Sequence, residues 1–111
     1  MLEHSAALDK AFHALSDATR RGLLERLSQG PASVSELARP YDCTLAAIHQ
    51  HVQILESSGL VTTQKHGRVR QCSLSPAAVL RVETWLSERR QLWQGYFDRL
   101  GQMLENEEDQ G

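Results

Sequence analysis

The residues from Asp42 to Gly59 limit the possible folds more than any other stretch of this chain, because they predict one well-defined helix. Its apolar residues recur at helical spacing and predict a single buried stripe, formed by Leu45, Ile48, Val52 and Leu55. Thr44 suits the N-cap position, and Gly59 suits a left-handed C-cap. The outward face carries small or uncharged polar residues in place of Glu and Lys: Ala46, Ala47, His49, Gln50 and Gln53.

This outward face has two interpretations. Small residues allow another surface to approach closely, and Gln and His hydrogen-bond base edges in the major groove of DNA. An amphipathic helix that packs on a core and leaves an idle polar face has the same pattern.

The segment before this helix favours the first interpretation. Residues 33–36, Ser-Val-Ser-Glu, form a capping box that opens a short helix, and Pro40 ends it because the residue before a proline is pushed out of helical space. Two helices joined by a tight turn over residues 40–42 predict a helix-turn-helix.

After Gly59 the pattern changes from helical to extended. Residues 60–65 and 68–74 are β-prone, and His66-Gly67 between them predicts the tight turn of a hairpin. A hairpin behind a helix-turn-helix is a wing, and its tip is basic, with Lys65, His66, Arg68 and Arg70. Such a tip suits the phosphate backbone of DNA, although ordinary solvation of a charged tip is the alternative.

Two helices are expected before the helix-turn-helix. Residues 6–15 have apolar residues at helical spacing, and Asp17 suits the N-cap of a helix from Ala18 to about Ser28. Arg20 and Arg21 lie in the first turn of that second helix, where the macrodipole disfavours cations. This placement predicts a phosphate or a carboxylate as their partner, unless the pair is simply solvated.

The last helix is expected to begin at Ser75-Pro76 and to end near Leu104. It holds both tryptophans of the chain, and a domain of this size leaves little core to cover so much apolar surface. Pairing with a second subunit is the economical solution, and packing within the chain is the alternative. The expected dimer interface joins the first and last helices through Leu8, Phe12, Trp85, Leu86, Leu92, Trp93, Tyr96, Phe97 and Leu100.

The net charge of −2 is unevenly distributed. Four acidic residues lie within 105–111, which we expect to be a disordered tail, and residues 1–104 carry 12 basic and 10 acidic side chains, a net charge of +2. We therefore expect one mainly α-helical domain with a small β-hairpin over residues 1–104. Without a signal peptide or a long apolar run, a soluble cytoplasmic protein is expected.

The order of these segments resembles the ArsR/SmtB family of bacterial repressors, in particular its members without an obvious metal site. The resemblance covers about residues 6–104 and rests on four runs: FHALSDATRR at 12–21, SVSELA at 33–38, HVQILESSGLV at 51–61 and GRVR at 67–70. It implies a winged helix-turn-helix homodimer that regulates transcription at an operator of inverted-repeat character.

The resemblance also implies roles for particular residues. The recognition helix is Thr44–Gln53 and the wing is Lys65–Arg70; His51 keeps the histidine usual in this subgroup, whereas His49 and Gln50 replace a serine and a lysine. The expected contacts with double-stranded DNA are Thr44, Ala46, Ala47, His49, Gln50, His51, Gln53, Lys65, His66, Arg68 and Arg70.

The residues bear on four other functions: a metal sensor, a thiol redox switch, an enzyme and a pure protein-interaction module. The cysteine and histidine ligands of the family's metal sites are missing from the third and last helices, so no cofactor is expected. His4 and His13, with Glu3, Asp9 or a residue of a partner chain, are candidate zinc or nickel ligands. Cys43 precedes a helix N-terminus, which lowers a thiol pKa, and is a candidate redox switch. An enzyme is not expected, because no third group orients Cys43 and a nearby histidine. A pure protein-interaction module would leave the basic wing without a purpose.

Overall fold

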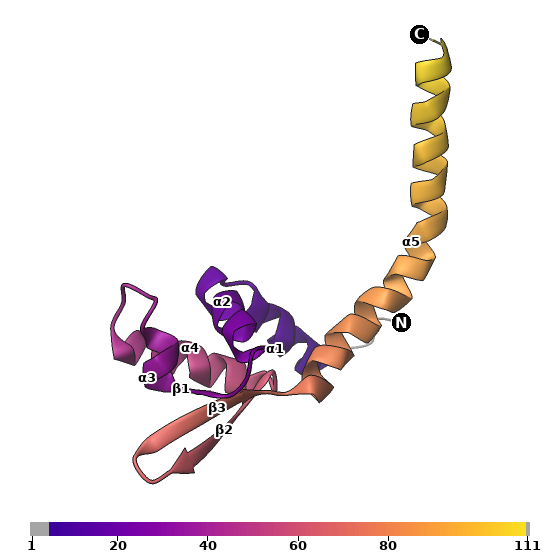
Figure 1. Cartoon of the computed structure of the whole chain (residues 1–111). Coiled ribbons are helices and arrows are strands. Elements are labelled where there is room, and N and C mark those ends of the chain that lie inside the picture. Colours follow the sequence, from indigo (N-terminus) through magenta and orange to yellow (C-terminus); the bar gives the residue numbers. More distant parts are fainter. Residues whose placement is uncertain (1–4, 111) are drawn as a thin grey trace. The chain divides into compact units, whose positions relative to one another are not determined.

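The computed structural model describes residues 5–110, and side chains through residue 107. The chain forms two compact units, of which the first ends at Leu80 and the second begins at Arg81 (Figure 1). The elements follow in the order α1 (Ala6–Leu15), α2 (Ala18–Leu27), β1 (Ala32–Ser33), α3 (Val34–Ala38), α4 (Leu45–Ser57), β2 (Val61–His66), β3 (Val69–Leu74) and α5 (Pro76–Gln110). The prediction of a mainly helical winged helix-turn-helix is confirmed.

The core of the first unit is built where α3, α4 and the hairpin meet. Its fully buried large side chains are Leu23, Leu37, Ile48, Leu55, Leu60, Val61 and Cys72. The Thr44 side chain caps α4 by accepting the Ala47 backbone N–H at 3.1 Å, and Gly59 has a φ of +81° behind it. The buried stripe of α4 therefore runs as predicted through Ile48, Val52 and Leu55. The prediction that Leu45 is the first buried residue of this stripe is wrong, because the Leu45 side chain is 48% exposed.

Within residues 5–110 the hairpin belongs to a three-stranded antiparallel sheet in the order β1-β3-β2. The edge strand β1, which was not predicted from the sequence, pairs with β3 through Ala32 and Cys72 and through Ser33 and Gln71. The pairing of His66 with Val69 places the turn at Gly67-Arg68, one residue later than predicted. Gly67 has a φ of +64° and no non-glycine residue described has a positive φ, which is the pattern of a type II′ turn. This turn matches the twist of the strands and fixes the wing tip.

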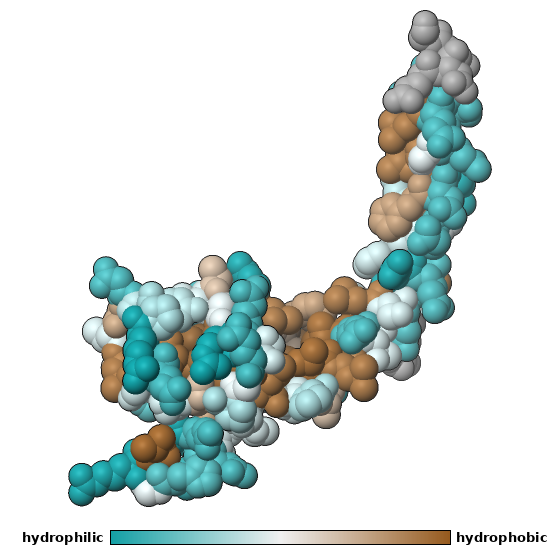
Figure 2. All heavy atoms as spheres, in the orientation of Figure 1, coloured by the Kyte–Doolittle hydropathy of each residue, from teal (hydrophilic) through white to brown (hydrophobic). Residues whose placement is uncertain are grey.

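The second unit consists of the greater part of α5. This helix continues to Gln110, so the predicted end near Leu104 and the predicted disordered tail differ from the structure. Large apolar side chains stay exposed along one side of it (Figure 2): Leu86, Leu92, Trp93, Tyr96, Phe97, Leu100, Met103 and Leu104. No described helix is long and apolar enough to cross a bilayer.

Candidate nucleic-acid interface

The outward face of α4 presents the side chains that the sequence predicted to read bases. Thr44, Ala46, Gln50 and Gln53 are exposed, and Ala47 and His49 are half-buried. Leu45 adds an exposed apolar side chain at the N-terminal end of the helix. Its spacing placed it with the core residues, but the helix begins at this residue and its side chain is only partly covered.

A cleft of about 320 Å³ lies between the wing and the N-terminal ends of α3 and α4. It brings His49 together with Arg68 and Arg70, and it is lined by Ser33, Val34, Ser35, Leu45, His49, Arg68, Val69 and Arg70. Ser35 was not among the predicted DNA contacts, because residues 33–36 were interpreted only as a capping box. The Ser33 hydroxyl is engaged with Glu36 as that box requires, whereas the Ser35 side chain is exposed. Side chains predicted to read bases and side chains predicted to bind phosphate thus share one concave surface.

The predicted wing residues Lys65, His66, Arg68 and Arg70 are all exposed. Lys65 and Arg70 are directly paired across β2 and β3, so their side chains lie on the same face of the hairpin. Like charges opposite each other destabilise a sheet. An anion that lies between the two cations removes this repulsion, and a DNA phosphate is such an anion.

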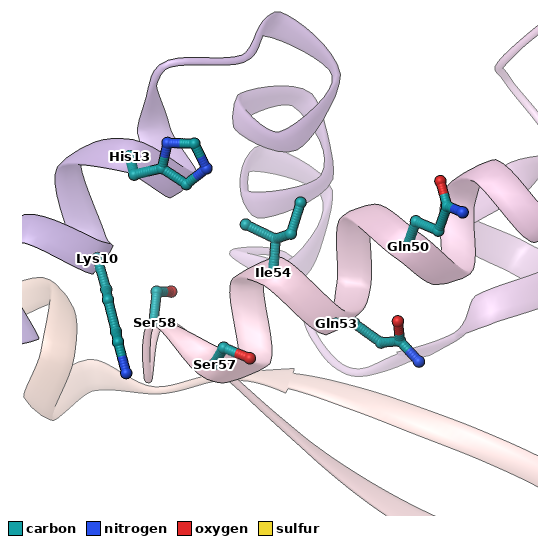
Figure 3. A pocket seen from close by; sticks show the side chains of 7 residues that line it. All are labelled: Lys10, His13, Gln50, Gln53, Ile54, Ser57 and Ser58. Carbon is teal, nitrogen blue, oxygen red and sulfur yellow. The ribbon is translucent and has the colours of Figure 1, made fainter.

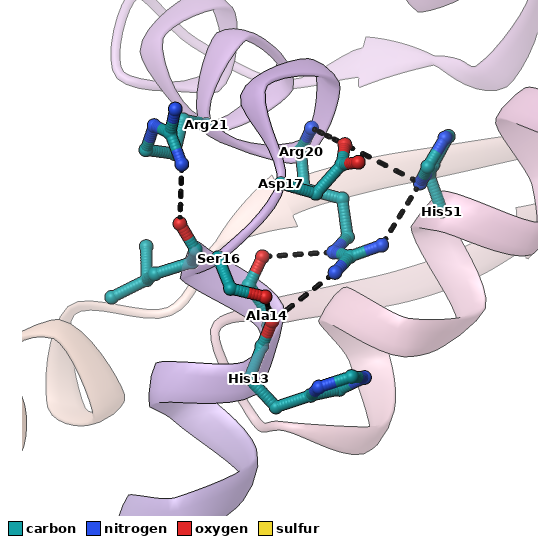
Figure 4. A network of polar contacts seen from close by, with 8 residues as sticks. His13, Ala14, Ser16, Asp17, Arg20, Arg21 and His51 are labelled. Atoms are coloured by element: carbon teal, nitrogen blue, oxygen red, sulfur yellow. Dashed lines mark hydrogen bonds and ion pairs between the residues drawn. The ribbon is translucent and has the colours of Figure 1, made fainter.

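His51 points away from this surface and into a polar network at the junction of α1 and α2 (Figure 4). The guanidinium of Arg20, which is 7% exposed, donates to the Ala14 carbonyl at 2.8 Å, to the His13 carbonyl at 3.1 Å and to His51 Nδ1 at 3.2 Å. Because a guanidinium can only donate, His51 Nδ1 accepts and its ring proton lies on Nε2. His51 therefore holds α4 against α2.

Asp17 belongs to the same network. Its carboxylate accepts the backbone N–H of Arg20 at 3.0 Å and caps α2, and its Oδ2 atom lies 3.9 Å from His51 Nδ1. The hydrogen bond from the Arg20 backbone N–H, helped by the positive charge of the Arg20 guanidinium, holds the pKa of Asp17 below its usual value.

The two arginines of the first turn of α2 do have partners, but not the predicted ones. Arg21 Nη1 donates to the Leu15 carbonyl at 2.8 Å, next to the carbonyls that Arg20 occupies. Both cations thus lie at the C-terminal end of α1, where the macrodipole favours positive charge and the last carbonyls lack helical partners. For the buried Arg20 the predicted phosphate or carboxylate partner is wrong, because carbonyls at the end of α1 hold its guanidinium. Arg21 is exposed and makes one such hydrogen bond, so a phosphate partner for Arg21 stays a prediction.

Residues 15–64 match the profile of a helix-turn-helix domain family. The chain is 34% identical over 101 residues to the HTH-type transcriptional regulator Rv2034 of Mycobacterium tuberculosis, and the match covers 91% of this chain and 92% of that protein. A crystal structure of an ArsR family transcriptional regulator has 48% sequence identity to the chain and a TM-score of 0.76, and the match covers 79% of this chain and 97% of that chain. The Escherichia coli arsenical resistance operon repressor is 32% identical over 87 residues, 73% of this chain and 74% of that protein. The chain belongs to the ArsR family of winged helix-turn-helix transcriptional regulators.

As a member of the ArsR family the chain is a DNA-binding transcriptional regulator and not an enzyme. The described residues contain no group of three His, Cys, Asp or Glu side chains that could hold a metal ion. His13 is exposed on α1, and the other predicted metal ligand, His4, lies outside the described residues. Cys43 is exposed before the α4 cap, whereas Cys72 is buried, which raises the pKa of its thiol.

Proposed function

We propose that this ArsR family regulator is a cytoplasmic repressor that binds, as a homodimer, an operator made of two inverted half-sites. The observation that carries the proposal is the cleft that combines the N-terminal end of α4 with Arg68 and Arg70 of the wing. This arrangement suits a recognition helix in the major groove with a wing over the adjacent backbone. The Escherichia coli relative is a repressor, which supports this direction of regulation.

Within each half-site we assign base reading to the exposed face of α4. Gln50 pairs best with adenine through N6 and N7, and His49 reaches a neighbouring base edge. Leu45 is exposed at the helix start and suits the methyl group of thymine. His51 is left out of this set because its Nδ1 atom is engaged by Arg20.

Phosphate contacts come from the wing and from the start of α4. Arg68 and Arg70, with Lys65 and His66, approach the backbone or the neighbouring minor groove and add affinity without sequence information. The Thr44 hydroxyl accepts the Ala47 N–H, and its own proton is available for a phosphate oxygen.

The dimer is proposed to form through α5 with help from α1. Apolar residues along α5 repeat with the heptad spacing of a helix that pairs with another helix: Leu86, Trp93, Tyr96, Leu100 and Met103. All five side chains are exposed in the single chain, as is Phe12 of α1. A second copy of the chain covers such a stripe by burying the same stripe of its own.

The test compares Gln50→Ala with Arg68→Ala on a panel of operator duplexes that differ at single base pairs, at two salt concentrations. Loss of Gln50 is expected to cost about 1–3 kcal/mol at one position and to relax specificity there. Loss of Arg68 is expected to weaken every duplex about equally and to reduce the salt dependence. If Arg68→Ala reorders the duplexes and Gln50→Ala does not, the assignment of reader and anchor is wrong.

A further inference from the structure

A second cleft, of about 520 Å³, lies between α1 and the C-terminal half of α4 (Figure 3). Lys10 and His13 come from α1, and the remaining lining residues come from α4 and its end: Gln50, Gln53, Ile54, Ser57 and Ser58. None of the described lining residues is acidic, and Lys10 carries a positive charge. The Gln50, Gln53 and Ser57 side chains can donate hydrogen bonds, whereas the Ser58 hydroxyl already donates to the Leu55 carbonyl at 2.6 Å. Lys10 therefore makes an anion the charged ligand that this cleft favours.

The cleft lies beside the outward face of α4, and this position favours a DNA phosphate as the anion. Gln50 and Gln53 line it, and both also belong to the exposed face of α4. Leu45 and His49 line the wing cleft, so the outward face of α4 has one cleft on each flank. A helix that lies in the major groove has a sugar–phosphate backbone on each side. Arg68 and Arg70 serve one of these backbones, and Lys10 lies on the flank of the other.

The cleft stays open if α1 contributes to a dimer interface. At 100° per residue, Lys10 lies about 160° and His13 about 100° around α1 from Phe12. Leu8 and Phe12 therefore face one way, and the Lys10 side chain faces the other, toward α4. A partner subunit that covers Phe12 does not cover Lys10.

We propose that the cleft between α1 and α4 is a DNA-backbone site in which Lys10, assisted by the His13 ring, binds a phosphate on the side of the major groove opposite the wing. This proposal rests on the proposed function, because it requires α4 to enter the major groove. It gives α1 a direct part in DNA binding besides its part in dimerisation.

The first test measures the salt dependence of binding to a nonspecific duplex for the wild type, Lys10→Gln and Lys10→Arg. Each lost phosphate contact lowers the slope of log K against log salt by about 0.9, so a dimer that loses both Lys10 contacts should lose roughly two units. Lys10→Arg keeps the charge and is expected to keep the slope. Lys10 is exposed, so neither change should alter the thermal unfolding of the protein.

Arg68→Ala serves as the reference for the wing. If Lys10→Gln keeps the wild-type slope while Arg68→Ala lowers it, the Lys10 site is refuted and the proposed function stands. If the wild type itself shows no salt-dependent binding to duplex DNA, both are refuted.

The second test locates the phosphate by ethylation interference on a selected operator duplex. In the wild type, ethylation should interfere on both backbones that flank each half-site. Lys10→Gln should lose interference on the backbone away from the wing, and Arg68→Ala should lose it on the backbone beside the wing. Loss of the same phosphates in both variants would refute the Lys10 site.

Discussion

Replacing Arg20 with methionine removes the guanidinium that joins α1, α2 and α4 but keeps a chain of similar length. The largest expected cost is at the Ala14 carbonyl, because the hydrogen bond from Arg20 Nε to it is buried. The His13 carbonyl also accepts the Ser16 N–H and hydroxyl, so it keeps partners. An orphaned buried carbonyl costs about 1–3 kcal/mol, and the lost contact to His51 adds about 1 kcal/mol.

Arg20→Met is therefore expected to lower the free energy of unfolding by about 2–4 kcal/mol. Arg21→Ala is the matched control, since the neighbouring Arg21 makes one exposed hydrogen bond to the end of the same helix. It is expected to cost less than about 1 kcal/mol. Urea unfolding at a fixed protomer concentration measures both, because the stability of a dimer depends on concentration.

A free energy of unfolding of Arg20→Met within about 0.5 kcal/mol of the wild type, or an equal loss in Arg21→Ala, would contradict this role of Arg20. Arg20→Lys separates charge from geometry. A lysine offers one compact cationic group and cannot reach two carbonyls and a histidine in the planar arrangement that Arg20 uses, so it should recover less than half of the loss.

Three further predictions concern Gly22, the aromatic residues of α5 and Asp17. A Cβ at Gly22 would collide with the Tyr41 hydroxyl, so Gly22→Ala should destabilise the wild type. In a Tyr41→Phe background the same change should stabilise the protein by up to about 1 kcal/mol, because alanine has the higher helix propensity. Equal effects in the two backgrounds would contradict the collision. Trp93→Asp combined with Phe97→Asp should give monomers with weak DNA affinity, and a wild-type monomer in sedimentation at micromolar concentration would contradict the proposed dimer. Because the pKa of Asp17 is lowered in the folded state, its stabilisation is present above the ordinary aspartate pKa and is lost as the pH falls through the lowered value. Asp17→Asn should lose that part of the acid dependence of urea unfolding, and an unchanged pH profile would show that Asp17 contributes nothing.

Periodicity and cap residues sufficed to predict every helix and the hairpin. These signals are local, since the spacing of Ile48, Val52 and Leu55 and the capping box at Ser33 are contained within one or two helical turns. The exposure of Leu45 could not be predicted in this way, because the spacing alone does not show how far other elements cover the first turn of α4. The extension of α5 through residues 105–110 was missed because the acidic composition was taken as a sign of disorder, although Glu is a good helix former.

The remaining differences depend on residues far apart in the sequence. His51 lies 31 residues from Arg20, so its inward orientation became visible only with the packing of α4 on α2. The strand β1 has two residues, too few for an alternating pattern, and it exists because β3 offers an edge. The cleft beside Lys10 likewise requires two helices that the sequence does not juxtapose.

The proposed function requires two copies of the chain to place two recognition helices in successive major grooves. Selection of bound duplexes from a random pool with the wild-type protein tests it most directly. The expected result is enrichment of two inverted half-sites whose centres lie about 34 Å, or one helical turn, apart. Enrichment of single half-sites, of direct repeats, or of no sequence at all would contradict the claim.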